Sequence, residues 1–197
     1  FLIRTVYEAN IRFEMTGQQN ATLRRQLGNF AFQMREYFGE LAPGNPPNDW
    51  QEAFQQLIHT LKQVESTEKL VLFFDEVPWL SHRKSGFLEG LDFFWNSWAV
   101  KRDNIIVVIC GSATSWMIRK IVYHKGGLHN RITKQVHLEP FNLNETEKFL
   151  VSKQVVLDRS QILQIYMAIG GIPHYLKEIE HGKSAVQNIK QLCFPKT

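Results

Sequence analysis

The sequence has few cysteines and no long apolar run. Its 197 residues include only two cysteines, Cys110 and Cys193, which lie far apart in the chain. A disulfide framework is therefore not indicated, and a reducing cytoplasm is the expected location. The apolar runs are too short to cross a membrane, and no signal-peptide pattern precedes the core. We expect no membrane partner.

The composition also lacks the signals of a metal cluster or a strong nucleic-acid site. The seven histidines and two cysteines show no metal-ligand spacing. The net charge of +4 comes from scattered residues, and basic clusters such as those at 24–25, 82–84 and 101–102 are short. Such clusters are more typical of solvated helix ends and loops than of a nucleic-acid stripe. Nucleic-acid binding stays open but unsupported.

The size and composition are those of a globular protein. A chain of this length buries roughly 70% of its unfolded surface, enough for one solid core and a small appended unit. Hydrophobic residues make up 44% of the sequence and charged residues 21%. The fourteen phenylalanines and five tryptophans predict an aromatic core, and their dispersed positions do not indicate a stacking platform.

The most informative motif is an apolar strand that ends in two carboxylates. Residues 70–74 are continuously apolar and Asp75 and Glu76 follow directly. An unbroken apolar run predicts a parallel strand that is buried on both faces. Ligands of open α/β sheets bind outside the carboxyl ends of such strands, so these acids are candidate site residues. The alternative is a solvated strand end with a helix-capping aspartate.

Further strands and helices alternate along the first part of the chain. The run 105–110 predicts a second buried parallel strand that ends at Gly111 and Ser112, and its last residue, Cys110, is expected to be a buried thiol. The segment 11–15 alternates as a half-exposed strand does, and 135–138 predicts a weaker strand. The chain opens at Phe1 within a predicted helix, and further helices are predicted from 21, at Asn48 or Asp49, at 87 and at 116. This order predicts an α/β parallel sheet.

The character of the sequence changes after Pro140. Asn144 and Glu147 predict a capping box at the start of one helix, and Asp158 and Gln161 predict the start of a second. Gly170 and Gly171 end that helix, Pro173 fits the first turn of the next, and the pattern is helical as far as Leu192. We therefore predict an α/β unit over 1–140 and a small all-helical unit over 141–197.

Three further features join the acid pair in chain order. Ser112 follows the second strand, Arg131 precedes the weak strand, and a Gly-x-Pro turn is formed by Gly171, Ile172 and Pro173. Each has a simple structural explanation when taken alone. The serine can cap a helix, the arginine can be solvated, and the turn can join two helices.

Taken together, these features resemble the archaeal-type ATPase family of P-loop NTPases, in the AAA+ and STAND group. The resemblance covers nearly the whole chain. It implies a three-layer, parallel-sheet P-loop NTPase core followed by an all-helical lid. It identifies the strand ending in Asp75 and Glu76 with the Walker B motif and the strand ending in Ser112 with the sensor strand. By the same resemblance, Arg131 reaches phosphate within one subunit or across an interface, and 171–173 packs near the nucleotide base.

One family motif has no match in the sequence. The pattern Gly-x-x-x-x-Gly-Lys-[Ser/Thr], the Walker A loop, is nowhere in the chain. In the family this loop and the strand before it precede the helix that here begins at Phe1. The loop supplies the backbone N–H groups and the lysine that hold the phosphates. We therefore expect the core to lack its first strand and P-loop, the parent protein to carry them upstream, and the fragment to be nearly inactive.

The function implied by the resemblance is binding and hydrolysis of ATP with Mg²⁺ in the intact parent, with a conformational switch as output. Asp75 would hold the magnesium ion, Glu76 would polarise the attacking water, Ser112 would orient water or γ-phosphate, and Arg131 would stabilise the transferring phosphoryl group. A homo-oligomer or a protein partner is left open.

Two alternatives remain at this stage. The missing phosphate loop and the modest basic charge allow a non-catalytic interaction module, or a DNA-associated one, on the same scaffold. A metal-dependent nuclease would need a further acid beside Asp75 and Glu76, such as Glu89 or Asp92, and both of these lie in a predicted helix.

Overall fold

The chain forms two compact units. A computed structural model describes residues 2–64, 66–82, 84–122 and 131–194. The units comprise Phe1–Thr133 and Lys134–Thr197, and each is described here by itself. No helix within the described residues is both long enough and apolar enough to cross a membrane. The predicted division at 140/141 and the nature of the two units stay predictions.

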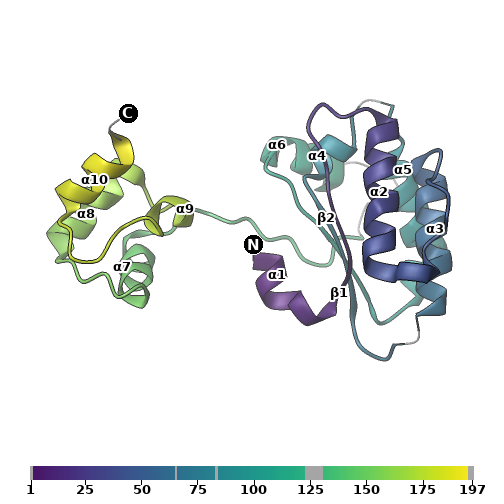
Figure 1. Cartoon of the computed structure of the whole chain (residues 1–197), viewed down its shortest axis with the longest axis horizontal. Helices are drawn as coiled ribbons and strands as arrows, with labels where there is room; N and C mark the ends of the chain where they lie inside the picture. The colour runs from purple at the N-terminus through teal and green to yellow at the C-terminus, as the bar shows by residue number, and fades with distance from the viewer. Residues whose placement is uncertain (1, 65, 83, 123–130, 195–197) are drawn as a thin grey trace. The chain divides into compact units, whose positions relative to one another are not determined.

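The first unit is built on a parallel sheet in the order β1-β2-β3. The strands are β1 (Ile11–Thr16), β2 (Leu70–Asp75) and β3 (Ile105–Ile109). β2 is central and pairs in parallel with both neighbours, with Thr16 opposite Asp75 and Phe74 opposite Ile109. The carboxyl ends of all three strands therefore meet at one edge, which Figure 1 shows near α4. The predicted α/β class is confirmed.

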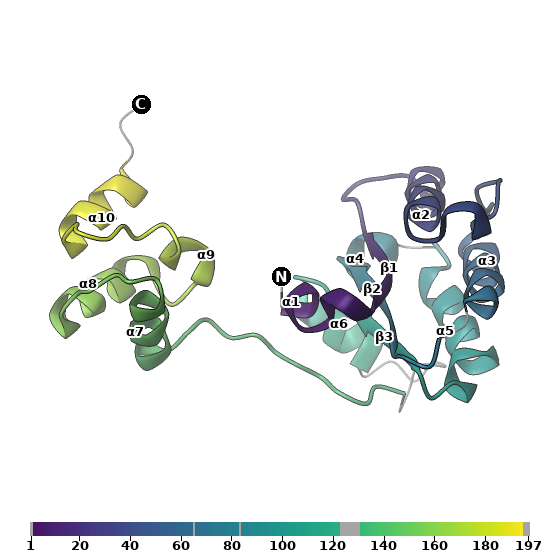
Figure 2. The same cartoon turned by 60° about the horizontal axis from the view of Figure 1, so that its bottom comes forward.

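Helices cover both faces of this sheet, giving the predicted three layers. Figures 1 and 2 show α2, α3 and α5 against one face and α1 and α6 on the other. The helices of this unit are α1 (Leu2–Tyr7), α2 (Leu23–Phe38), α3 (Trp50–Gln63), α4 (Val77–Leu80), α5 (Phe87–Ser97) and α6 (Thr114–Met117), with a π-helix at Ile118–Val122 and 3₁₀ turns at Glu8–Asn10, Gly39–Leu41 and Ala99–Lys101. Thr22 and Asp49 cap α2 and α3 with their side-chain oxygens.

Aromatic side chains fill the space between the sheet and α2, α3 and α5. Phe54 of α3 lies at the centre, with its ring 5.7 Å from those of Phe74 and Phe87 and 5.5 Å from that of Phe94. The Trp50 ring meets the Phe87 ring edge-on at 4.9 Å. All five side chains are fully buried. Aromatic pairs in such tilted and edge-on geometries add about 0.5–1.5 kcal/mol each beyond area burial, so this cluster fixes the helices on β2.

Three predictions about the strands are wrong in detail. β3 is only partly buried after Ile105, because it is an edge of the sheet formed by the described residues. Cys110 lies beyond the end of β3 and is exposed rather than buried. Residues 135–138 form no strand, and Val136 and Leu138 are exposed. Alternation alone does not create a strand where no neighbouring strand pairs with the backbone.

The described part of the second unit contains helices and no strand. It contains α7 (Leu143–Ser152), α8 (Arg159–Ile169), α9 (Pro173–Leu176) and α10 (Ala185–Cys193) around a separate apolar cluster that includes Leu150, Ile165 and Leu176. The predicted capping box is displaced by two residues, because Asn142 and Glu145 form it. Residues 177–184 are not helical, and Ser184 caps α10.

Candidate active site at the carboxyl edge of the sheet

The acid pair lies where the chain leaves the central strand. Asp75 is the last residue of β2, and its carboxylate accepts a hydrogen bond from the Glu76 N–H at 2.9 Å. Glu76 has φ 48° and ψ 47°, the left-handed region that a residue with a side chain seldom adopts. Such strain persists where the surroundings impose it and is enriched at functional sites. Here the Val77 N–H donates to the Cys110 carbonyl at 2.9 Å and fixes the turn to the end of β3.

Glu76 follows β2 and Ser112 follows β3, and the two residues lie in direct contact. The Ser112 hydroxyl donates to Glu76 Oε2 at 3.0 Å, and the Ser112 N–H lies 3.4 Å from the same oxygen. Both side chains lie at the carboxyl edge of the sheet, and Ser112 is exposed. The structure therefore brings three of the predicted site residues, Asp75, Glu76 and Ser112, into one place.

Cys110 lies beside Asp75 at the same edge of the sheet. Desolvation by its neighbours, followed by the charge of Asp75 and a hydrogen bond to Asp75, raises the pKa of the Cys110 thiol. Although the residue is exposed, its thiol is therefore protonated near neutral pH and can donate to Asp75. Cys110 is not among the site residues predicted from the sequence, because its place at the end of an apolar run predicts a core thiol.

Two glycines allow the loops at this edge to pack closely. The Gly17 N–H donates to the Asp75 carbonyl at 2.9 Å, and a Cβ on Gly17 would lie 2.6 Å from the Glu76 carbonyl oxygen. A Cβ on Gly111 would lie 2.6 Å from Cδ of Pro78. Real Cβ atoms do not approach backbone or ring atoms so closely. Glycine at both positions therefore lets the ends of β1 and β3 lie against the turn that carries Glu76.

The buried side chain of Gln26 ties two of these loops together. Its amide nitrogen donates to the carbonyls of Gln18, at 2.7 Å, and Trp79, at 3.2 Å, and its amide oxygen accepts from the Gln18 N–H at 3.2 Å. Gln18 follows β1, and Trp79 lies in α4 directly after Glu76. A polar residue on the apolar face of the predicted helix, between Leu23 and Phe30, was the signal in the sequence.

Replacing Gln26 by methionine is expected to lower the free energy of unfolding by about 2–3 kcal/mol. Methionine keeps the length of the side chain but leaves the backbone groups of Gln18 and Trp79 without their partner, and an unsatisfied buried polar group costs about 1–3 kcal/mol. Urea denaturation followed by circular dichroism measures the change. Gln51→Met, at an exposed position of α3, is the matched control and should change stability by less than about 0.5 kcal/mol.

The structure assigns no role to the remaining predicted site residues, Arg131 and 171–173. Arg131 is exposed in a stretch without regular structure. Gly171, Ile172 and Pro173 belong to the second unit, where the Phe141 N–H donates to the Gly171 carbonyl at 2.7 Å and Pro173 opens α9. Their roles toward a nucleotide stay predictions.

The donor atoms at the edge of the sheet fit a magnesium ion. Asp75 and Glu76 offer carboxylate oxygens and Ser112 a hydroxyl, and all are oxygen donors, as hard cations prefer. Within the described residues no three histidine, cysteine or acidic side chains are grouped as a metal-ligand cluster. Magnesium is commonly held by one or two carboxylates together with waters and substrate phosphates, so the small donor set suits it.

A nuclease site is not supported by the same residues. Glu89 is exposed on α5, and the Asp92 carboxylate accepts a close hydrogen bond from its neighbour Asn96. Neither joins Asp75 and Glu76 in a group of three acids within the described parts of the chain. The alternative that used Glu89 or Asp92 therefore lacks its third ligand.

A parallel α/β core with an acid pair and a serine at its carboxyl edge is typical of nucleotide-binding α/β proteins. Sequence comparison makes the family explicit, because residues 4–179 match the family described as "ATPase domain predominantly from Archaea". The match spans most of the chain, and the chain belongs to this archaeal ATPase family. Among proteins with curated descriptions, none matches the sequence.

The fold also resembles a solved ATPase structure. The Walker-type ATPase PABY2304 of Pyrococcus abyssi superposes with a TM-score of 0.58 at 14% sequence identity. The match covers 99% of this chain and 59% of that chain. At this identity the likeness concerns the fold alone. The chain thus spans less than two thirds of the length of the structure it resembles.

Proposed function

We propose that this chain is the Walker B, sensor and lid portion of an ATPase of the AAA+/STAND type, which binds Mg-ATP and hydrolyses the β–γ bond in the intact protein. The observation that carries the proposal is the 3.0 Å contact between the Ser112 hydroxyl and Glu76 Oε2 at the carboxyl edge of the sheet. Membership of the ATPase family supports the class of reaction.

Each side chain has a distinct part in the proposed reaction. Asp75, aligned with the end of β2, would hold magnesium, which when bound neutralises charge on the phosphate oxygens. Glu76 would accept the proton of the attacking water on a carboxylate oxygen. The hydrogen bond from Ser112 holds that carboxylate in one orientation, and the turn conformation of Glu76 directs it away from the strand. Positioning of this kind lowers the entropic cost of the attack.

Elements outside this cluster would complete the site in the intact protein. We assign 1–140 to the NTPase core and 141–197 to the lid, with 171–173 near the base and Arg131 near the phosphates, as the family resemblance implies. A lid that closes on ATP would make the output a conformational switch, read by a protein partner or a second copy. The paucity of cysteines supports a cytoplasmic location.

Calorimetric titration of the full-length protein with Mg-ATP tests the proposal. We expect saturable binding that weakens by about tenfold or more, equivalent to about 1.4 kcal/mol, when EDTA removes magnesium or when Asp75 is replaced by asparagine. Asp103→Asn, in the loop before β3, is the matched control and should bind normally. A protein that binds no nucleotide under these conditions would instead be a non-catalytic interaction or DNA-associated module.

A further inference from the structure

The outer edge of β1 has backbone groups that no other strand pairs within the described residues. Among the described residues β1 is an end strand of the sheet and pairs with β2 alone. At its carboxyl end the Gly17 N–H points to β2 and donates to Asp75. Because backbone groups alternate between the two edges of a strand, those of Glu14 and Thr16 point the other way. An edge of this kind is a template for a further strand.

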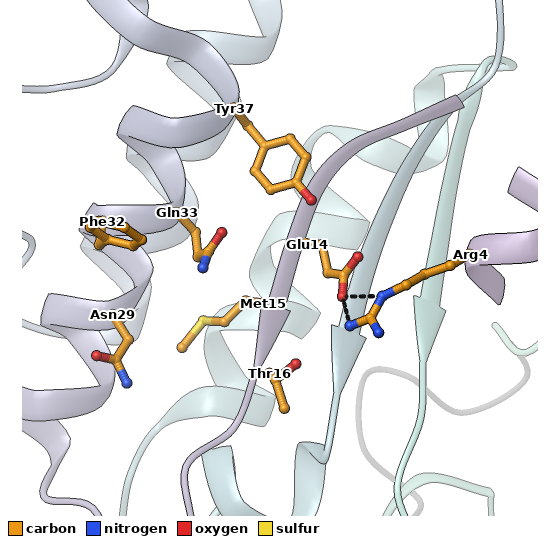
Figure 3. A pocket seen from close by; sticks show the side chains of 8 residues that line it. All are labelled: Arg4, Glu14, Met15, Thr16, Asn29, Phe32, Gln33 and Tyr37. Carbon is orange, nitrogen blue, oxygen red and sulfur yellow. Dashed lines mark hydrogen bonds and ion pairs between the residues drawn. The ribbon is translucent and has the colours of Figure 1, made fainter. Parts of the chain in front are cut away.

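A cavity of about 340 Å³ lies along this edge. Figure 3 shows Asn29, Gln33 and Tyr37 on one face of α2, directed toward β1, with Thr16 on the strand. These side chains offer amide and hydroxyl groups to an occupant. Phe32, also in the lining, is 52% exposed and adds an apolar surface. The cavity is therefore mainly polar with one aromatic wall.

The charges in the cavity are already matched. Arg4 Nε donates to Glu14 Oε1 at 2.8 Å, and Arg4 Nη2 makes a close contact with the same oxygen, as the dashed lines of Figure 3 show. Burial and the charge of Glu14 raise the pKa of Tyr37, so its hydroxyl stays protonated and can both donate and accept. A charged occupant would be desolvated here without a free counter-charge.

We propose that the outer edge of β1 binds an extended peptide segment of a partner protein, and that the side chains of this segment facing the cavity carry no charge. The peptide adds to the sheet as a further strand through the backbone of Glu14 and Thr16. The amides of Asn29 and Gln33 bond its polar groups, and one aliphatic or aromatic side chain packs on Phe32. This site goes beyond the proposed ATPase function and does not depend on it.

The length of the site follows from an irregularity in β1. The pairing of β1 with β2 shifts register between Ile11 and Phe13, so the regular part of the strand runs from Phe13 to Thr16. Bulges of this kind interrupt strand addition. We therefore expect the peptide to pair with the second half of β1, beside the cavity, and a short peptide to suffice.

Blocked, fluorescein-labelled hexapeptides provide the binding test. One set contains only threonine, valine, asparagine and tyrosine; two matched sets carry two glutamates or two lysines at alternate positions. Fluorescence anisotropy with the full-length protein should show that the neutral set binds at least tenfold more tightly than either charged set. Hydrogen exchange should slow at the Glu14 and Thr16 amides when a neutral peptide is added. Equal binding of all sets, or no binding below millimolar peptide, would overturn the proposal.

Substitutions at the edge separate strand addition from other contacts. Thr16→Pro removes one outward N–H, a loss that an edge strand tolerates, and should lower the affinity for the neutral peptide at least tenfold. Thr16→Val keeps the N–H and should leave the affinity unchanged.

Gln33→Ala should lower the affinity for the neutral peptide about fivefold, whereas Gln51→Ala on α3 should leave it unchanged. Glu76→Gln should not alter peptide affinity, so a failed ATPase assignment leaves this test valid. Unchanged binding by both Thr16→Pro and Gln33→Ala contradicts the assignment.

Discussion

Replacing Glu76 by glutamine in the full-length protein is expected to reduce the rate of ATP turnover by about 10²–10⁴-fold, the usual contribution of a general base. Glutamine has the shape of glutamate and can still accept the hydrogen bond from Ser112 Oγ, but it cannot take a proton from water. The affinity for Mg-ATP should change by less than about threefold, because the side chain acts on water rather than on the nucleotide. Steady-state phosphate release and calorimetry measure the two quantities.

Ser112→Ala is the companion substitution. It removes the hydroxyl that donates to Glu76 and leaves the carboxylate in place, so we expect a smaller fall in turnover, about tenfold. Glu89→Gln, at an exposed position of α5, should have no effect. Loss of nucleotide binding and turnover to the same extent in Glu76→Gln would contradict the role of Glu76 as a base.

Gly171→Ala is expected to lower the free energy of unfolding of the second unit by about 3 kcal/mol or more. A Cβ at this position would overlap the Phe141 carbonyl oxygen and lie 2.6 Å from the Phe141 carbonyl carbon. Both contacts are with backbone, so no side-chain rotation relieves them. The hydrogen bond from the Phe141 N–H to the Gly171 carbonyl would be lost as the segments move apart. Thermal and urea unfolding monitored by circular dichroism measure the effect.

Gly28→Ala is expected to raise stability rather than lower it. Gly28 lies within α2, and a Cβ there would meet no atom within 4 Å other than its chain neighbours and the backbone of its own helix. Alanine should therefore stabilise the first unit by up to about 1 kcal/mol through helix propensity. If Gly171→Ala unfolds at the same urea concentration as the unchanged protein, the close packing of Phe141 on Gly171 is wrong.

The elements that could be predicted from the sequence are those in which a local pattern agrees with the tertiary environment. β2 is buried in the sheet, as its unbroken apolar run predicts. Asp49 and Asp158 cap helices as their positions predict, since capping depends on a few neighbouring residues. The capping box was misplaced because Asn142 and Asn144 are both followed three residues later by a glutamate, and only the tertiary start of α7 distinguishes them.

The features that could not be predicted depend on contacts between distant segments. An apolar strand is fully buried only where other strands and helices cover it. β3 is continuously apolar, yet only its first residue, Ile105, is buried. The hydrogen bonds of Gln26 reach Trp79 in α4, and the close approach of Gly17 to Glu76 joins loops far apart in sequence. Because Asp75, Glu76 and Ser112 follow predicted parallel strands, the sequence predicts that they lie at one edge of the sheet. The hydrogen bond between Ser112 and Glu76 could not be predicted, because it depends on the register of β2 with β3.

The most direct test of the ATPase site is a crystal structure of the full-length protein with Mg²⁺ and a non-hydrolysable ATP analogue. We expect the γ-phosphate at the carboxyl edge of the sheet, with Asp75 bound to magnesium directly or through its water. A water between the γ-phosphate and the Glu76 carboxylate should lie within hydrogen-bond distance of both. A nucleotide bound elsewhere, with Asp75, Glu76 and Ser112 facing only solvent, would contradict the account.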